Sequence, residues 1–165
     1  LAIGRVDCAV VYNVAPSAAV DLLPVLDEPL YLVSARPRAG GRLIGAPIRL
    51  AEVAERELVI PSRPHSVRML LEAALAAQGR RALVALEIES VPAMLELVRT
   101  DALHAVLARN ALKSSGAEDA YRARPIIEPA LKTTRWIATS AQRARGPLLE
   151  RSTALLRELL LEHRS

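Results

Sequence analysis

The chain has 165 residues, a net charge of +4 and a sequence pI of about 9.8, which is enough length for one domain or two small lobes with a real core. No apolar run approaches the roughly 20 residues that a membrane span requires, so no transmembrane segment is predicted. The positive charge is carried almost wholly by arginines that are spread along the chain and mixed with glutamates, which argues against direct contact of this segment with DNA or RNA.

The first third of the chain predicts three strands and a loop. Residues 6–12 form a mostly apolar run of strand length, as expected of a strand that is covered on both faces. Residues 21–26 and 30–33 have the pattern of two further strands, separated by the breaker Asp27-Glu28-Pro29. The stretch "SARPRAGGRLIGAPIRLAE" then contains two prolines and two adjacent glycines, so it is a candidate lobe boundary. Residues 50–55 are expected to form one or two helical turns.

Strands and helices alternate in the middle of the chain. Residues 58–60 predict a short buried strand, and the helix after it places its apolar residues on one stripe at i, i+3, i+4 spacing. Gly79 is well placed to end this helix. Residues 83–88 predict another strand, followed by a second helix for which Ser90 is a plausible N-cap and Pro92 fits the first turn.

The last third begins with a fourth short strand of this region, residues 104–107, and a polar loop at residues 113–120. Residues 121–127 and 131–139 have extended patterns, and a final helix is expected from about residue 147. The middle of the chain therefore reads β-α-β-α-β, which is typical of a parallel sheet.

This order of elements predicts an α/β fold of two lobes, one inserted into the other. Residues 1–37 and 130–165 are assigned to a discontinuous first lobe that is truncated at its N-terminus. Residues 38–129 are assigned to the second lobe, and two extended segments cross between the lobes.

The turn between the first strand and the first helix of the second lobe carries unusual chemistry. Ser62, Arg63, His65 and Ser66 lie just before a helix N-terminus, where free backbone N–H groups and the helix dipole favour an anion. Ser90 begins the next helix in an equivalent place, and open α/β sheets bind ligands at these strand ends. Two interpretations stay open: these groups hold a carboxylate, or the serines only cap helices.

Further candidate effector-binding residues are Tyr12, Asn13, Val91 and His104. Tyr12 and Asn13 end the first strand and can face the cleft from the other lobe. The alternative for Asn13 is that it only turns the chain.

The sequence gives no signature of a metal site or an active site. None of the three histidines has metal-ligand spacing, and Cys8 lies in a strand pattern. Glu87 and Glu89 share one face of a strand, but no activated nucleophile or base accompanies them, and a solvated edge is the commoner setting for such a pair. No glycine-rich phosphate-binding motif occurs either, so we expect that the protein binds no cofactor and is not an enzyme. As the single cysteine, Cys8 cannot form an internal disulfide, and a reducing cytoplasm is the simplest setting.

Five stretches of the chain carry a family resemblance: "LAIGRVDCAVVYN", "LLPVLDEPLYLVS", "ELVIPSRPHSVRMLLEAAL", "EIESVPAMLELVRTDALHAVLARNAL" and "IIEPALKTTRWIAT". The first resembles the "L-x-x-G-x-L-D-L-A-L" segment of LysR-type transcriptional regulators. The fourth resembles that family's "E-x-x-S … L-V-x-x-G-L-G-x-x-L-L-P" stretch. The match follows the family's order over essentially the whole chain.

The resemblance implies an effector-binding domain of two Rossmann-like lobes of the type II periplasmic-binding-protein kind. A small, anionic metabolite is expected in the cleft between the lobes, with Ser62 and Ser90 as ligand-binding rather than merely capping residues. The resemblance also implies a homodimer or homotetramer in the bacterial cytoplasm. It implies contact with DNA through a winged helix-turn-helix that precedes this segment and is absent from it.

The chain departs from the family pattern at one turn. Asp101-Ala102-Leu103 stands where the family has Gly-Leu-Gly, and Ala108 stands where it has proline. Since glycines permit a tight helix-to-strand turn, their replacement is expected to alter that turn and the pocket wall beside it.

Two other classes of function remain as alternatives. The first is a solute-binding protein of a transport system, which uses the same two lobes for capture alone. The second is a small α/β enzyme. A secretory signal upstream of this segment would favour the first alternative, and a winged helix there would eliminate it.

Overall fold

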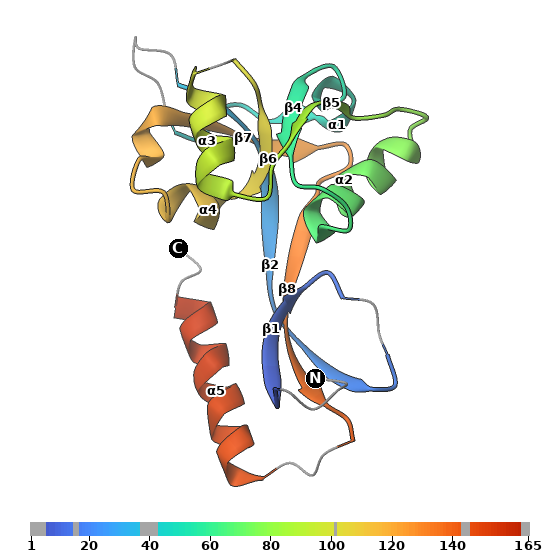
Figure 1. The fold of residues 1–165 in the computed structure, drawn as a ribbon, viewed down its shortest axis with the longest axis vertical. Coiled ribbons are helices and arrows are strands. Elements are labelled where there is room, and N and C mark those ends of the chain that lie inside the picture. The colour runs from blue at the N-terminus through green and yellow to red at the C-terminus, as the bar shows by residue number, and fades with distance from the viewer. Residues whose placement is uncertain (1–5, 15–16, 37–42, 101, 143–145, 163–165) are drawn as a thin grey trace. The chain divides into compact units, whose positions relative to one another are not determined.

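The computed structural model of the chain describes residues 6–14, 17–36, 43–100, 102–142 and 146–162. The chain divides into two compact units, residues 1–28 with 133–165, and residues 29–132. Two strands run from one unit into the other, β2 (Val20–Ala35) and β8 (Lys132–Ser140) (Figure 1). The predicted α/β fold is confirmed.

The strand β2 is continuous, so the prediction of two strands broken at Pro29 is wrong. Proline has no N–H to donate, but its fixed φ is compatible with extended backbone. The registered pairing of β2 with its neighbours in the second unit begins just after the proline, at Leu30 and Tyr31. Pro29 is also the first residue of that unit. The unit therefore begins inside β2, and the lobe boundary expected at residues 37 and 38 stays a prediction.

The strands of the second unit lie side by side. Its remaining strands are β3 (Ile48–Arg49), β4 (Glu57–Ile60), β5 (Leu83–Glu87), β6 (Ala105–Ala108) and β7 (Tyr121–Ile127). β4 pairs with β5 in parallel, and a parallel bridge from Leu58 to His104 joins β4 to the start of β6. β2 lies antiparallel to both β6 and β7, and β3 is parallel to β7. The spatial order is therefore β5-β4-β6-β2-β7-β3.

Helices cover both faces of this sheet, because its strands are apolar on both sides. The helices are α1 (Leu50–Val53), α2 (Ser66–Ala76), α3 (Val91–Thr100) and α4 (Arg109–Lys113). In β4, Leu58 and Ile60 pack in one core with α1 and α2, while Val59 between them packs in a second core with α3 and α4. The predicted β-α-β-α-β order of this region is confirmed.

The predicted loop at residues 113–120 is partly wrong. Its first residue, Lys113, ends α4, and a 3₁₀ turn spans Glu118–Ala120. Between them the chain turns at Gly116, whose φ of +68° suits a residue without Cβ. The polar composition indicated the turn but not the short helices on either side of it.

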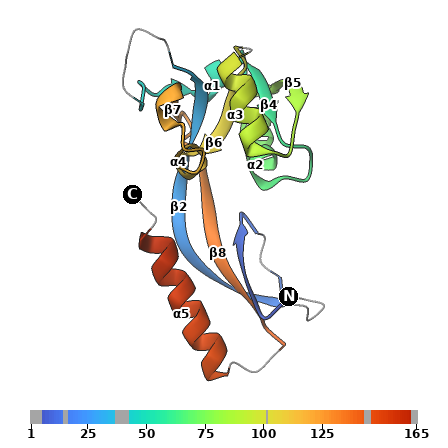
Figure 2. The same ribbon diagram turned by 60° about the vertical axis from the view of Figure 1, so that its left-hand side comes forward.

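In the first unit, β1 (Cys8–Tyr12) pairs antiparallel with β8, and β8 lies beside β2. The helix α5 (Pro147–Glu162) follows β8 in the chain (Figure 2). None of its described residues is buried, and Leu148 is 80% exposed. No helix in the described part of the chain is both long and apolar enough to span a membrane.

Candidate functional site

The carboxyl ends of β4 and β5 lie side by side and carry the predicted turn. The N–H of Ile88 donates to the carbonyl of Ile60 at 3.0 Å, which continues the parallel pairing past the end of β5. Pro61 and Ser62 follow β4, and Glu89 and Ser90 follow β5. This pairing brings Ser62, Ser90 and Val91, the first residue of α3, to the same end of the sheet, as the sequence analysis expected.

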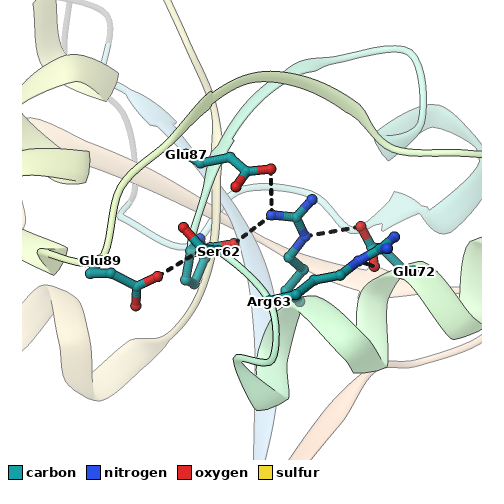
Figure 3. Close-up of polar contacts among 7 residues, drawn as sticks. Ser62, Arg63, Glu72, Glu87 and Glu89 are labelled. Atoms are coloured by element: carbon teal, nitrogen blue, oxygen red, sulfur yellow. Dashed lines mark hydrogen bonds and ion pairs between the residues drawn. The ribbon is translucent and has the colours of Figure 1, made fainter.

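The backbone N–H of Ser62 is already occupied by a carboxylate of the chain itself. It donates to Oε1 of Glu89 at 2.8 Å (Figure 3). A hydrogen bond from a neutral N–H to an ionised carboxylate is among the stronger hydrogen bonds in proteins. The donor that was predicted for an anionic ligand thus holds an internal anion, and the sequence analysis assigned Glu89 no such role.

Beneath the turn lies a buried arginine that the sequence analysis missed. Arg68 is 8% exposed and donates to the carbonyl of Pro61 at 3.0 Å. It also pairs with Oε1 of Glu72 at 3.0 Å and with Oε1 of Glu87 at 2.7 Å. Hydrogen bonds to Glu87 and then to Glu72 raise the pKa of Arg68 above its ordinary value. Arg68 therefore holds the backbone at the end of β4 through the Pro61 carbonyl and links it to Glu72 on α2 and Glu87 on β5.

A signal for Arg68 was present in the sequence. Arg68, Leu71 and Leu75 are the buried residues of α2, and their i, i+3, i+7 spacing places them on one stripe. An arginine on the inward stripe of a helix, four residues before Glu72, indicates a buried ion pair.

Arg63 faces Glu72 of α2. Its Nε lies 2.9 Å from Oε2 of Glu72, and this bond together with that from Arg68 lowers the pKa of the Glu72 carboxyl despite its partial burial. The guanidinium predicted for a ligand is therefore engaged by the helix in this structure.

His65, and neither serine of the turn, caps α2. Its Nδ1 accepts a hydrogen bond from the N–H of Val67 at 3.3 Å, and Ser66 is the first helical residue. In α3 the expected cap is present but long: Oγ of Ser90 accepts from the N–H of Ala93 at 3.4 Å. Capping therefore explains Ser90 in part and leaves the hydroxyls of Ser62 and Ser66 without that role.

His104 lies away from this cluster. It precedes β6 and bonds to the amino end of β4, with its N–H on the carbonyl of Glu57 and its carbonyl on the N–H of Val59, both at 2.9 Å. Ser62 follows the opposite end of the same strand, so the structure does not bring the two together. Burial, and then the charge of Arg56, lower the pKa of His104, and its Nδ1 is buried without a hydrogen-bond partner.

Tyr12 and Asn13 belong to the first unit, where Asn13 turns the chain. Its φ of +46° lies in the left-handed region that asparagine tolerates, and its Oδ1 accepts from the N–H of Thr134 at 2.9 Å. Its Nδ2 is buried without a partner. The ring of Tyr12 lies under the guanidinium of Arg135 at 5.7 Å, and Arg135 pairs with Glu28 at 2.7 Å. The turn interpretation of Asn13 thus has direct support, and its contact with an effector stays a prediction.

The departures from the family pattern can be followed in part. Asp101 lies outside the described residues, Ala102 has a φ of +56°, and Leu103 packs against the core beside α3. Ala108 is the residue before α4 and has extended backbone angles. Among the described residues, no group of three or more His, Cys, Asp or Glu side chains could hold a metal ion.

Comparison with known proteins identifies the family of this chain. Residues 1–161 match the model of the LysR substrate binding domain. The chain is 31% identical over 159 residues to the nitrogen assimilation regulatory protein Nac of Klebsiella aerogenes, covering 96% of this chain and 49% of that protein. The chain thus spans about half the length of this curated relative.

Solved structures show the same fold. The regulatory domain of CcmR from Synechocystis, in complex with 2-PG, has a TM-score of 0.78 at 18% identity, covering 95% of this chain and 74% of that one. The effector binding domain of QuiR, in complex with shikimate, has a TM-score of 0.72 at 21% identity, covering 90% and 68%. The sequence match over nearly the whole chain and the shared fold agree: the chain belongs to the LysR substrate binding domain family.

Proposed function

We propose that this chain is the effector-sensing regulatory domain of a bacterial LysR-type transcription factor, and that it binds a small carboxylate-bearing metabolite. The family match over residues 1–161 is the observation that carries this proposal. Two structural relatives with the same fold are complexes with small molecules, 2-PG and shikimate, which supports ligand sensing. The two alternative classes have no support among these matches, since the family is one of regulators and is not an enzyme class.

The proposed effector site is the carboxyl end of the β4–β5 pair in the second unit. Ser62, Ser66, Ser90 and the backbone at Val91 supply hydroxyl and N–H groups at the starts of two helices, where an anion is favoured. Arg63 and His65 flank this position and are exposed. The guanidinium of Arg63 is bound to Glu72, so it contributes to a ligand only by leaving that carboxylate.

The remaining parts of the mechanism follow from the same proposal. Effector binding shifts the equilibrium between two arrangements of a homodimer or homotetramer by as much as its affinity differs between them. DNA is contacted by a winged helix-turn-helix outside this segment, and the protein acts in the cytoplasm. Compact units 1–28 with 133–165, and 29–132, serve as the two regulatory lobes.

Isothermal titration calorimetry with a panel of small carboxylates, shikimate and 2-PG among them, tests this function. We expect at least one compound to bind, and Ser62→Ala combined with Ser90→Ala to weaken that binding. The matched control is Ser114→Ala, because the Ser114 hydroxyl donates to the carbonyl of Asn110 in α4 and lies outside the turn. A ligand whose affinity is the same in the double variant and in wild type would contradict the proposed site.

A further inference from the structure

We propose that Glu89 is an internal competitor for the effector carboxylate, and that it thereby determines which carboxylates the site accepts. The Glu89 carboxylate accepts a hydrogen bond from the N–H of Ser62. A ligand carboxylate takes that N–H only when Glu89 leaves it. This inference rests on the proposed effector site.

The contact has the geometry of a ligand contact. The donor is a backbone N–H at the end of a parallel strand, and the acceptor is a carboxylate oxygen at 2.8 Å from a residue 27 positions away in sequence. The pairing of Ile88 with Ile60 holds the two segments in register and so delivers Glu89 to this donor. A carboxylate of the chain therefore sits where a carboxylate of a ligand would bind (Figure 3).

Glu89 differs from the two carboxylates nearby in how it is held. Glu72 is bound by two guanidinium groups, and Glu87 is bound by buried Arg68. In the described part of the chain, the N–H of Ser62 is the one hydrogen-bond partner recorded for the exposed Glu89 side chain. Glu89 can therefore swing away without breaking the ion-pair network that supports the turn.

The same network leaves little positive charge free for an incoming anion. Arg68 is neutralised by Glu72 and Glu87, and Arg63 is bound to Glu72. A plain carboxylate must displace Glu89 and then remain close to it, and like charges at short range repel. A ligand that carries an ammonium group beside its carboxylate offsets this cost, because the ammonium pairs with the displaced Glu89. The site should therefore favour an amino-carboxylate over a plain carboxylate.

Acetate and glycine form a matched pair of probes, since glycine is acetate with an added ammonium group. We would follow the backbone amide resonance of Ser62 by ¹H–¹⁵N NMR in the 165-residue protein, at constant ionic strength. In wild type we expect glycine to bind more tightly than acetate at this amide. In Glu89→Gln, acetate should bind up to about tenfold more tightly than in wild type, because a charged hydrogen bond at an exposed site contributes modestly. Glycine should then bind no more tightly than acetate.

The control variant is Glu96→Gln on α3, which removes one negative charge from the same unit while the Glu96 carboxylate bonds to Arg99 and not to Ser62. It should leave both affinities as in wild type. Acetate binding that is no tighter in Glu89→Gln than in wild type overturns the competition, as does an equal gain in Glu96→Gln. Equal affinities of wild type for glycine and acetate overturn the selection.

These results are separable from the test of the proposed function. If no carboxylate of the calorimetric panel binds, the effector proposal fails, yet the response of the Ser62 amide in Glu89→Gln still reports whether Glu89 screens an anion position. If a panel ligand binds at Ser62 and Ser90 and its affinity is unchanged in Glu89→Gln, the effector site stands and the internal competitor is refuted.

Discussion

Arg68 should contribute more to stability than any exposed arginine of the second unit, and Arg68→Met tests this. Methionine keeps the apolar stem of the side chain and removes the guanidinium. The change strips the buried carbonyl of Pro61 of its donor and deletes ion pairs to Glu72 and Glu87. Glu72 keeps Arg63, so it is not left as an isolated buried charge.

The magnitude follows from these three contacts. An acceptor left unsatisfied in the interior costs about 1–3 kcal/mol. A partly exposed ion pair contributes about 0.2–1 kcal/mol. This range applies to the pair of Arg68 with Glu87, because the Glu87 side chain is 47% exposed. With two such pairs, we expect the free energy of unfolding to fall by roughly 1.5–5 kcal/mol, the upper end of which is typical of breaking a fully buried pair.

Urea denaturation followed by far-UV circular dichroism measures this change, and amide hydrogen exchange of Val59 and Ile60 locates it in β4. The control is Arg99→Met, because Arg99 and Glu96 form an i, i+3 pair with both side chains at least half exposed. Its loss should leave the free energy of unfolding nearly unchanged, because solvent screens an exposed ion pair. If Arg68→Met destabilises the protein no more than Arg99→Met, the buried network does not hold the turn.

Two further predictions concern the second unit. Burial lowers the pKa of His104 below its ordinary value of 6.5, so the folded state binds fewer protons than the unfolded state, and stability should fall as the pH drops below that value. Between pH 7.5 and pH 5.5 the melting temperature of His104→Gln should therefore fall by less than that of wild type. An equal fall in both proteins would contradict the burial of His104. Leu75→Ala should lower the free energy of unfolding by about 2–5 kcal/mol in the same urea assay, because Leu75 is fully buried. Leu86 is 43% exposed, so the control Leu86→Ala should change it by about 0.5 kcal/mol or less. Similar effects of the two variants would argue against the packing of α2.

Much of the second unit could be predicted from the sequence because its signals are local. The run Leu58-Val59-Ile60 and the apolar stripe of the next helix report burial directly, and Gly79 adopts the positive φ of +67° expected just past a helix end. The start of α3 at Val91 follows from Ser90 and the proline behind it. Each of these elements depends on neighbours within one or two helical turns.

What could not be predicted depends on residues far apart in sequence. Pro29 reads as a breaker by itself, and its place in β2 follows from the partners that β2 gains directly after it. The position of His104 is a second case, because it depends on the parallel bridge to Leu58, which puts His104 beside the amino end of β4. Its contact with an effector stays a prediction.

The candidate site shows a more general reason why the sequence analysis overestimated the free donors. A helix N-terminus after a parallel strand offers N–H groups, and counting these groups with nearby cations predicts an anion site. The count omits the acceptors that the same topology delivers: residues after the neighbouring parallel strand reach the same edge of the sheet, as Glu89 does at Ser62. Before such a turn is assigned to an external anion, the N–H groups that acidic residues just past the adjacent strand can bind must therefore be left out of the count of free donors. At this turn Glu89 holds the N–H of Ser62, so we expect the affinity of an external carboxylate there to depend on how much better it binds this N–H than Glu89 does.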